Sequence, residues 1–157
     1  MYTSYQPNCM SHLLLKDTFD NFSFIEGEIT TFNKFTISGF LQEDFFDEKP
    51  EETYSRWNKT RDFCFQIIRG KRTPLGFKIV LALPEDQVPY FLTAHGLTGY
   101  RPEEIRGLYL NFHYDGHHLQ CITGTSLNTF TMDKSIEREW DQEVKNILKS
   151  RSIEGDY

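Results

Sequence analysis

The chain has 157 residues, and its 23 Asp and Glu residues exceed its 17 Lys and Arg residues, giving a formal net charge of −6. Its 24 aromatic residues (14 Phe, 8 Tyr and 2 Trp) exclude a largely disordered protein, because disordered chains are poor in aromatics. No apolar run approaches the roughly 20 residues that cross a bilayer, and three widely separated cysteines exclude a disulfide framework. We therefore expect one cytoplasmic domain over residues 1–157, with frayed ends at about 1–8 and 151–157 and no membrane partner, cofactor or metal.

After an N-terminal helix, residues 25–41 predict a β-hairpin closed by the three-residue turn Phe32-Asn33-Lys34. This register places Ile29 opposite Ile37 and Gly27 opposite Gly39, so that the apolar residues share one side. The paired glycines would leave a shallow spot where another segment can approach closely. Residues 43–52 follow with six acidic side chains and one lysine, which indicates a solvated loop.

A helix is expected over about residues 51–69, because its apolar residues form one stripe that includes Tyr54, Trp57, Cys64, Phe65 and Ile68. Residues 63–68 also alternate as a strand would, so both interpretations of that stretch stay open. The nearly continuous apolar run at residues 77–83 predicts a central strand buried on both faces. A short helix should then follow Pro84 and Pro89 and end at Gly96.

The second half predicts a three-strand meander and a last helix that starts near Asp133. The first two strands, residues 107–114 and 117–123, flank Asp115-Gly116, a strong hairpin signal. A two-residue turn there pairs Asn111 with Gln120 and His113 with His118 on the outer face. The core face would then carry Leu108, Leu110, Phe112, Leu119 and Cys121. The third strand is expected at residues 126–132.

Hairpin connections of this kind predict an α+β fold rather than a doubly wound nucleotide-binding fold. We expect a mainly antiparallel sheet of about six strands, made of the hairpin, the central strand and the C-terminal meander. About four helices should pack on it.

A local excess of positive charge is the clearest functional signal. Residues 56–78 hold seven basic residues and one acidic residue, a balance of +6, whereas the remaining ten basic and 22 acidic residues give −12. A basic patch on an acidic body attracts phosphate or carboxylate partners, although cations beyond a helix C-terminus also have a purely structural role. The expected ligand-binding residues are Arg61, Arg69, Lys71, Arg72, Thr73 and Lys78.

Arg61 lies within the apolar stripe of the predicted helix, so its guanidinium must be paired, stacked or extended to solvent. One interpretation is a structural ion pair with an acid such as Asp133 or Asp141. The alternative is a ligand-orienting arginine in a pocket beside Trp57.

The outer face of the second hairpin is a secondary candidate for a polar binding surface, formed by Asn111, His113, His118 and Gln120. His113 and His118 could share a metal, but a catalytic metal needs a third protein ligand and none is near, so we expect no metal site here. Residues 123–126, Thr-Gly-Thr-Ser, read as a turn between strands that could present N–H groups and Ser126 to a phosphate. Both features are also consistent with ordinary solvent-facing structure.

Several short motifs resemble a family of small bacterial proteins of unknown function found in anaerobic gut Firmicutes. They span nearly the whole chain and include Tyr54-x-x-Trp57 with Arg61, Gly70-Lys71-Arg72-Thr73-Pro74, Tyr114-Asp115-Gly116 and Trp140-Asp141. The resemblance implies no catalytic residue, binding residue or cofactor.

The residues themselves favour a non-enzymatic binding module for an anionic partner, either a phosphate-bearing molecule or a nucleic acid. The first alternative is a small enzyme with a pocket around Arg61. The second is a protein-interaction subunit or homodimer joined by exposed aromatic side chains such as Phe45 and Phe46.

Overall fold

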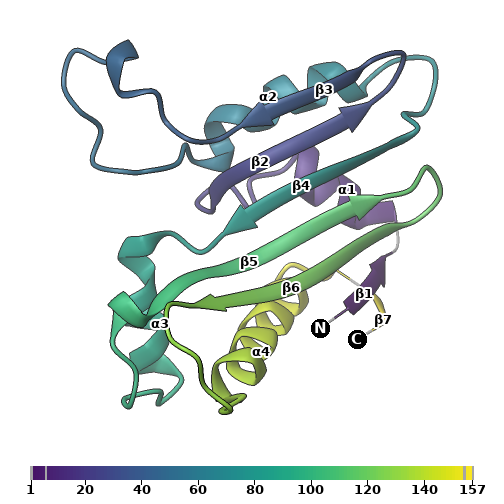
Figure 1. Ribbon diagram of the computed structural model, residues 1–157. Coiled ribbons are helices and arrows are strands. Elements are labelled where there is room, and N and C mark those ends of the chain that lie inside the picture. Colours follow the sequence, from purple (N-terminus) through teal and green to yellow (C-terminus); the bar gives the residue numbers. More distant parts are fainter. Residues whose placement is uncertain (1, 6, 154, 157) are drawn as a thin grey trace.

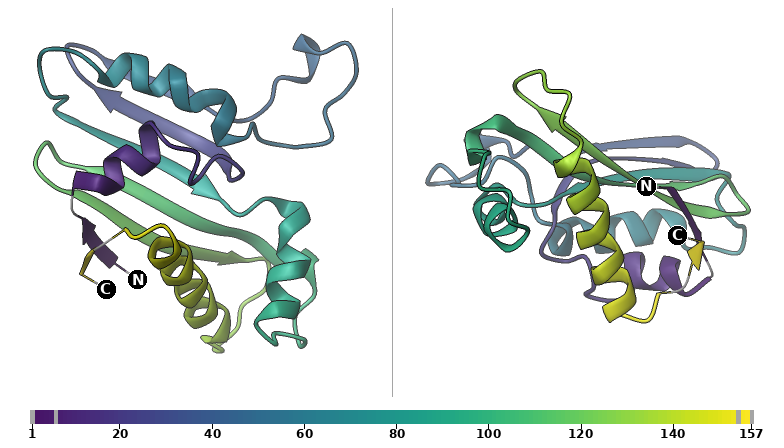
Figure 2. Two further views of the ribbon diagram at one scale, coloured as in Figure 1. Left: turned by 180° about the vertical axis from the view of Figure 1, so that it is seen from behind. Right: turned by 90° about the horizontal axis from the view of Figure 1, so that it is seen from below.

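An antiparallel sheet with helices on one face forms the frame of the protein in a computed structural model that describes residues 2–5, 7–153 and 155–156 (Figures 1 and 2). The strand order is β3-β2-β4-β5-β6-β1-β7, and every recorded pairing is antiparallel. The bounds are β1 Tyr2–Tyr5, β2 Ser23–Thr30, β3 Lys34–Ser38, β4 Gly76–Ala82, β5 Ile105–Tyr114, β6 Leu119–Leu127 and β7 Gly155–Asp156. Strands β2 to β6 form the main sheet, which confirms the predicted α+β class.

Three of the four α-helices in the described residues cover one face of the sheet, and no helix lies over the opposite face, here called the open face (Figure 2). The helices are α1 Pro7–Leu14, α2 Trp57–Ile68, α3 Val88–Ala94 and α4 Ser135–Ser150. Helices α1, α2 and α4 lie over the covered face, whereas α3 lies at one end of the sheet. The buried residues of α4 recur every four positions and form the stripe that the sequence predicts: Ile136, Trp140, Val144 and Leu148.

Helix α2 settles the alternative left open for residues 63–68, because they are helical through Ile68. Its predicted start at residue 51 is wrong. Residues 53–56 are instead an extended segment whose Tyr54 and Arg56 form isolated bridges with Phe40 and Ser23. The extended segment ties the chain after β3 to the start of β2, so α2 begins only at Trp57.

The predicted close approach is present at Gly39 alone, because Gly27 pairs with Ile37 and the predicted glycine pair does not form. A Cβ built on Gly39 would lie 1.8 Å from the carbonyl oxygen of Phe24, so no larger residue fits without moving the backbone. Ser55 lies between these two segments: its N–H donates to the oxygen of Gly39 (2.9 Å), and its oxygen accepts from the N–H of Phe24 (2.7 Å). Glycine therefore allows the 53–56 segment to join the sheet at this point.

Both hairpin registers differ from the predicted ones by two residues. In the first hairpin Ile29 pairs with Phe35 and Gly27 with Ile37, around the turn 31–33. In the second, His113 pairs with Gln120 and Asn111 with Ile122, so the predicted pairs His113–His118 and Asn111–Gln120 are wrong. A slip of two residues keeps every side chain on its predicted face. The predicted core-face residues Leu108, Leu110, Phe112, Leu119 and Cys121 are accordingly all buried.

The third strand predicted at residues 126–132 does not form. Strand β6 instead continues through the Thr-Gly-Thr-Ser stretch to Leu127, so the turn expected at 123–126 is wrong as well. Beyond it, Asn128 donates its side-chain amide to the oxygen of Glu103 (2.7 Å), and Phe130 and Met132 are exposed. Residues 128–132 accordingly belong to no strand.

Strand β4 has the predicted central position between β2 and β5, and as predicted it has buried residues on both faces, with Lys78 as its one exposed residue. Phe77, Ile79 and Leu81 face the helices and are buried, and on the opposite face Val80 and Ala82 are also buried while Lys78 is exposed. Where the structure describes the two ends expected to fray, they are paired, β1 with β6 and β7 with β1. Among the described residues, no helix combines the length and the apolar character that crossing a membrane requires.

Candidate functional site

The loop that joins α2 to β4, residues 69–75, carries most of the predicted binding residues. It starts at Arg69, whose backbone is extended and whose N–H donates to the oxygen of Phe65 (2.8 Å), closing the last turn of α2. It ends at Leu75, whose N–H donates to the oxygen of Thr30 in the first hairpin (2.9 Å). Between these anchors Pro74 is buried, while residues 69–73 are exposed. The loop is thus fixed at both ends and presents its middle to solvent.

A surface cavity of about 600 Å³ lies between this loop, the end of α2 and the hairpin turn. We call it the basic cavity. Its polar side is formed by Arg69, Gly70, Lys71, Arg72 and Thr73. Its apolar side is formed by Phe32, Ile67, Ile68 and Leu75, of which Phe32 and Leu75 are 87% and 70% exposed. An anion with an attached apolar group would find both kinds of contact here.

The three cations of the basic cavity have no counterion within the described part of the chain. Arg69, Lys71 and Arg72 make no ion pair within 4.0 Å, whereas Arg56, on the same basic segment, is held by Glu52 at 2.8 Å. Cations just beyond α2 also complement the negative end of the helix dipole. That interaction does not use up their hydrogen-bond donors, so the loop can stabilise the helix and still bind an anion.

Arg61 lies outside the basic cavity, in an ion pair that joins α2 to the segment after α1. Its Nε is 3.2 Å from Oδ1 of Asp20, and its Nη1 donates to the oxygen of Lys16 at 2.5 Å. The two side chains are only 17% and 16% exposed. Burial raises the pKa of Asp20, and the charge of Arg61 opposes that rise. The structural interpretation of Arg61 therefore fits its contacts, with Asp20 as the partner instead of Asp133 or Asp141.

Two other predicted residues also lie away from the basic cavity. Lys78 is on the open face of β4, opposite Glu28 of β2 and His113 of β5, and lines a separate hollow of about 380 Å³. Trp57 is fully buried, and its Nε1 donates to the oxygen of Leu13 at 2.9 Å. Of the predicted site, the structure therefore brings together Arg69, Lys71, Arg72 and Thr73.

The secondary candidates are spread along the open face of the sheet. Asn111 donates its side-chain amide to the oxygen of Ile122 (3.0 Å), and His113 lies beside Gln120. His118 is in the hairpin loop, where its N–H donates to Oδ1 of Asp115 (2.7 Å). Ser126 lies in β6 opposite Gly107, so its backbone belongs to a strand and not to a phosphate-binding turn. These residues form no single cluster.

Comparison with known proteins places the chain in a family. A family model described as a family of unknown function, DUF5721, matches residues 12–156. The chain belongs to DUF5721. The match confirms the resemblance to an uncharacterised family that the sequence motifs indicated. No curated protein and no solved structure matches the chain.

The DUF5721 chain also holds a polar cluster that the sequence analysis missed. The ring of His95 at the end of α3 lies between two carboxylates of α4: Nδ1 is 2.8 Å from Glu139 Oε2, and Nε2 is 2.7 Å from Glu143 Oε2. The only sequence signal is the spacing of the two glutamates, four positions apart on one helix face. Among the described residues, no group of three or more His, Cys, Asp and Glu side chains is arranged to hold a metal ion. We interpret the cluster as a structural contact that holds α3 against α4.

Burial alone would lower the pKa of His95, but its hydrogen bonds and charge interactions with Glu139 and Glu143 outweigh burial and raise it above 6.5. Because the folded-state pKa is the higher one, the stabilisation is complete below pH 6.5 and is lost as the pH rises through that raised value. We expect His95→Gln to lower the free energy of unfolding by about 1–3 kcal/mol at pH 6. At pH 9 the difference should nearly vanish. Urea unfolding of the wild type and the variant at the two pH values measures this difference. An equal loss of stability at both pH values would contradict a stabilising charge interaction of His95 with the two glutamates.

Proposed function

We propose that this chain is a non-enzymatic binding module that holds the phosphate groups of an anionic partner in the basic cavity. The observation that carries the proposal is the gathering of Arg69, Lys71 and Arg72, without counterions among the described residues, around one cavity of a chain with net charge −6. A local positive field on an acidic body concentrates anions at that place and keeps them from binding elsewhere. Arginine also forms paired hydrogen bonds with phosphate oxygens.

The apolar side of the cavity favours an organic phosphate over a free inorganic ion. The exposed ring of Phe32 and the side chains of Ile67 and Leu75 lie beside the cations and offer contact area to a ring or chain attached to the phosphate. Aromatic side chains next to cationic ones commonly stack on the bases of nucleotides and single strands. A nucleotide-like anion would use both sides of the cavity.

The residues around the cavity support binding rather than catalysis. The described residues of its lining include no Asp, Glu, His or Cys side chain, and Thr73 and Thr31 carry its hydroxyl groups. General acid–base and nucleophilic chemistry at neutral pH need a group that can take up a proton near the reacting atoms. Arg61, the residue on which the enzyme alternative depends, is bound to Asp20 and Lys16 instead.

We expect Lys71→Glu combined with Arg72→Glu to weaken the binding of ATP, and of a fluorescent 12-nucleotide single strand, by at least about tenfold at low salt, since each replaced cation removes a phosphate contact. The slope of log affinity against log salt for the single strand should fall by about 2. Calorimetry for ATP and fluorescence anisotropy for the single strand measure these changes.

The matched control is Arg138→Glu with Lys145→Glu on α4, which makes the same change in net charge away from the cavity. It should keep wild-type affinity. Equal loss in both double variants would show that overall charge governs binding, and absence of binding to the wild type at low salt would refute the proposal. Binding of ATP without binding of the single strand, or the reverse, would identify the phosphate source.

A further inference from the structure

A second surface feature carries charge opposite to that of the basic cavity. The acidic loop, residues 43–52, follows β3 and carries six acidic side chains and one lysine. It presents two phenylalanines to solvent, Phe45 at 85% and Phe46 at 41% exposure, with their rings edge to face at 5.6 Å. Exposed aromatic side chains held together in this way mark surfaces that contact another molecule.

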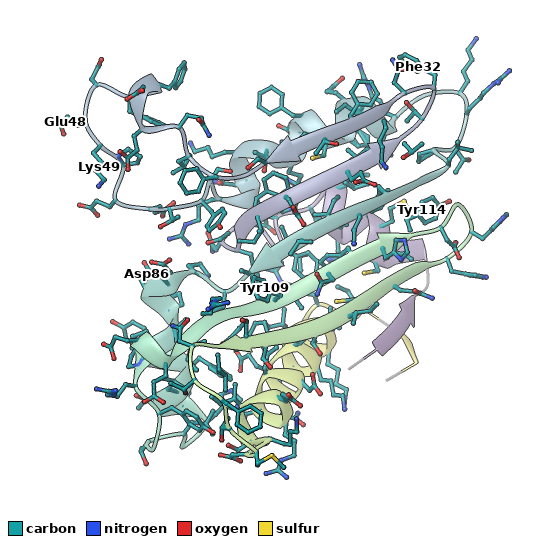
Figure 3. All side chains as sticks on the ribbon, in the orientation of Figure 1. Phe32, Glu48, Lys49, Asp86, Tyr109 and Tyr114 are labelled. Carbon is teal, nitrogen blue, oxygen red and sulfur yellow. The ribbon has the colours of Figure 1, made fainter. Side chains whose placement is uncertain are left out.

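The acidic loop and the basic cavity lie at opposite ends of the layer formed by β3 and α2 (Figure 1). Figure 3 shows Glu48 and Lys49 at one end and Phe32 at the other. Helix α2 starts beside the acidic loop at Trp57 and ends at the cavity with Ile68, and its 12 residues span about 18 Å. The acidic loop therefore points away from its own cavity and is positioned to reach the cavity of a different molecule.

We propose that the acidic loop of one copy binds in the basic cavity of a second copy, head to tail. The loop carboxylates other than Glu43 and Glu52, which are paired with Lys49 and Arg56, would pair with the cations of the cavity. The rings of Phe45 and Phe46 would pack on its apolar side. The inference rests on the proposed function in one respect, the attraction of the cavity for anions. It adds that self-association and phosphate binding compete for the same place.

Charge complementarity favours this arrangement over a symmetric dimer. A two-fold dimer joined through Phe45 and Phe46 would bring two loops together, each with six acidic residues, and the like charges would repel. A heterologous contact pairs acid with base instead and leaves one loop and one cavity unused at the ends of the assembly. Assembly should therefore continue beyond two copies. Because a loop in a cavity buries little surface area, the contact between copies should be weak and sensitive to salt.

Two variants test the proposal by blocking one end each. The loop variant carries Phe45→Ser and Phe46→Ser, exposed positions with little role in folding, and the cavity variant carries Lys71→Glu and Arg72→Glu. We expect the mass of the wild type in sedimentation velocity at low salt to rise with concentration beyond twice 18.6 kDa. Each variant alone should remain monomeric. An equimolar mixture should form a complex of two chains and stop there, because only one intact loop can meet one intact cavity.

A wild type that stays monomeric at all concentrations, or assemblies that persist in both variants alone, would overturn the inference. A wild-type dimer that stops at two copies and is not restored in the mixture would also overturn it, in favour of a symmetric contact. The Arg138→Glu, Lys145→Glu control should assemble as the wild type does. If self-association fails while ATP still binds, only this inference fails. If ATP does not bind while the mixture forms its two-chain complex, the proposed function fails and this inference stands.

Discussion

Replacing Trp57 with alanine is expected to lower the free energy of unfolding by about 3–5 kcal/mol, the usual cost of truncating a buried tryptophan. Trp57 is fully buried at the start of α2, and its ring packs on Phe24 with the centroids 5.5 Å apart. Its Nε1 donates to the oxygen of Leu13, which joins α2 to α1. Alanine would leave both a cavity and an unpaired carbonyl group. Urea denaturation followed by far-ultraviolet circular dichroism measures the change.

Trp57→Phe is the matched control, because it keeps most of the ring and removes the donor to Leu13. It should cost about 1–3 kcal/mol, the penalty for leaving a buried acceptor unpaired. Since Trp57 lies in the core and not in the basic cavity, the folded phenylalanine variant should bind ATP with wild-type affinity. An alanine variant as stable as the wild type would contradict the burial. A phenylalanine variant that folds normally but loses ATP affinity would restore Trp57 to the binding site.

Periodic patterns made the main elements of the fold predictable. The four-residue spacing of Ile136, Trp140, Val144 and Leu148 identifies α4, and the apolar alternation around Asp115-Gly116 identifies the β5–β6 hairpin. Register is harder to predict, because a slip of two residues leaves the apolar pattern unchanged. In the second hairpin Oδ1 of Asp115 accepts the N–H groups of His117 and His118, and this closes a longer loop than the sequence signal suggests.

The interpretation of residues 123–126 as a turn failed because tertiary pairing overrode local propensity. A small hydroxyl-rich stretch with one glycine is typical of a turn, yet Thr123 pairs with Leu110 and Gly124 with Tyr109 in a continuous ladder. Thr123 also donates its hydroxyl to Asp141 of α4 at 2.5 Å. These partners lie far enough away in sequence that no local pattern indicates them.

The candidate site also combines features that neighbouring residues reveal with features that depend on tertiary packing. The charge of residues 69–73 was visible in the sequence, because it depends on neighbouring residues alone. The other side of the cavity was not, since Phe32 comes from a hairpin turn nearly 40 positions earlier. The counterion of Arg61 was also hidden: Asp20 lies 41 positions away, and only the packing of α2 on the segment after α1 brings the two together.

Replacing Arg61 with methionine is expected to lower the free energy of unfolding by about 3 kcal/mol at pH 7, the lower end of the range for breaking a buried ion pair. The lower end applies because the side chains of Arg61 and Asp20 are 17% and 16% exposed, so the pair is not fully removed from water. Methionine keeps the apolar stem and removes the charge, which leaves the carboxylate of Asp20 without its partner. Asp20→Asn serves as the second single variant, and the double variant completes a cycle that isolates the pair.

The loss of stability in Arg61→Met should depend on pH, which a loss of packing alone would not do. The charge of Arg61 lowers the pKa of Asp20 against the effect of burial, so the pKa of Asp20 should rise further in Arg61→Met. In that variant the folded state therefore keeps the proton of Asp20 to a higher pH than the unfolded state does. A folded state that binds more protons gains stability as the pH falls. The destabilisation in Arg61→Met should therefore shrink between pH 7 and pH 5, whereas in the Asp20→Asn background it should stay constant. Equal losses in both backgrounds would mean that the guanidinium of Arg61 stabilises the fold independently of Asp20, for example through its hydrogen bond to the oxygen of Lys16. A folded Arg61→Met protein with reduced ATP affinity would place Arg61 in the binding site after all.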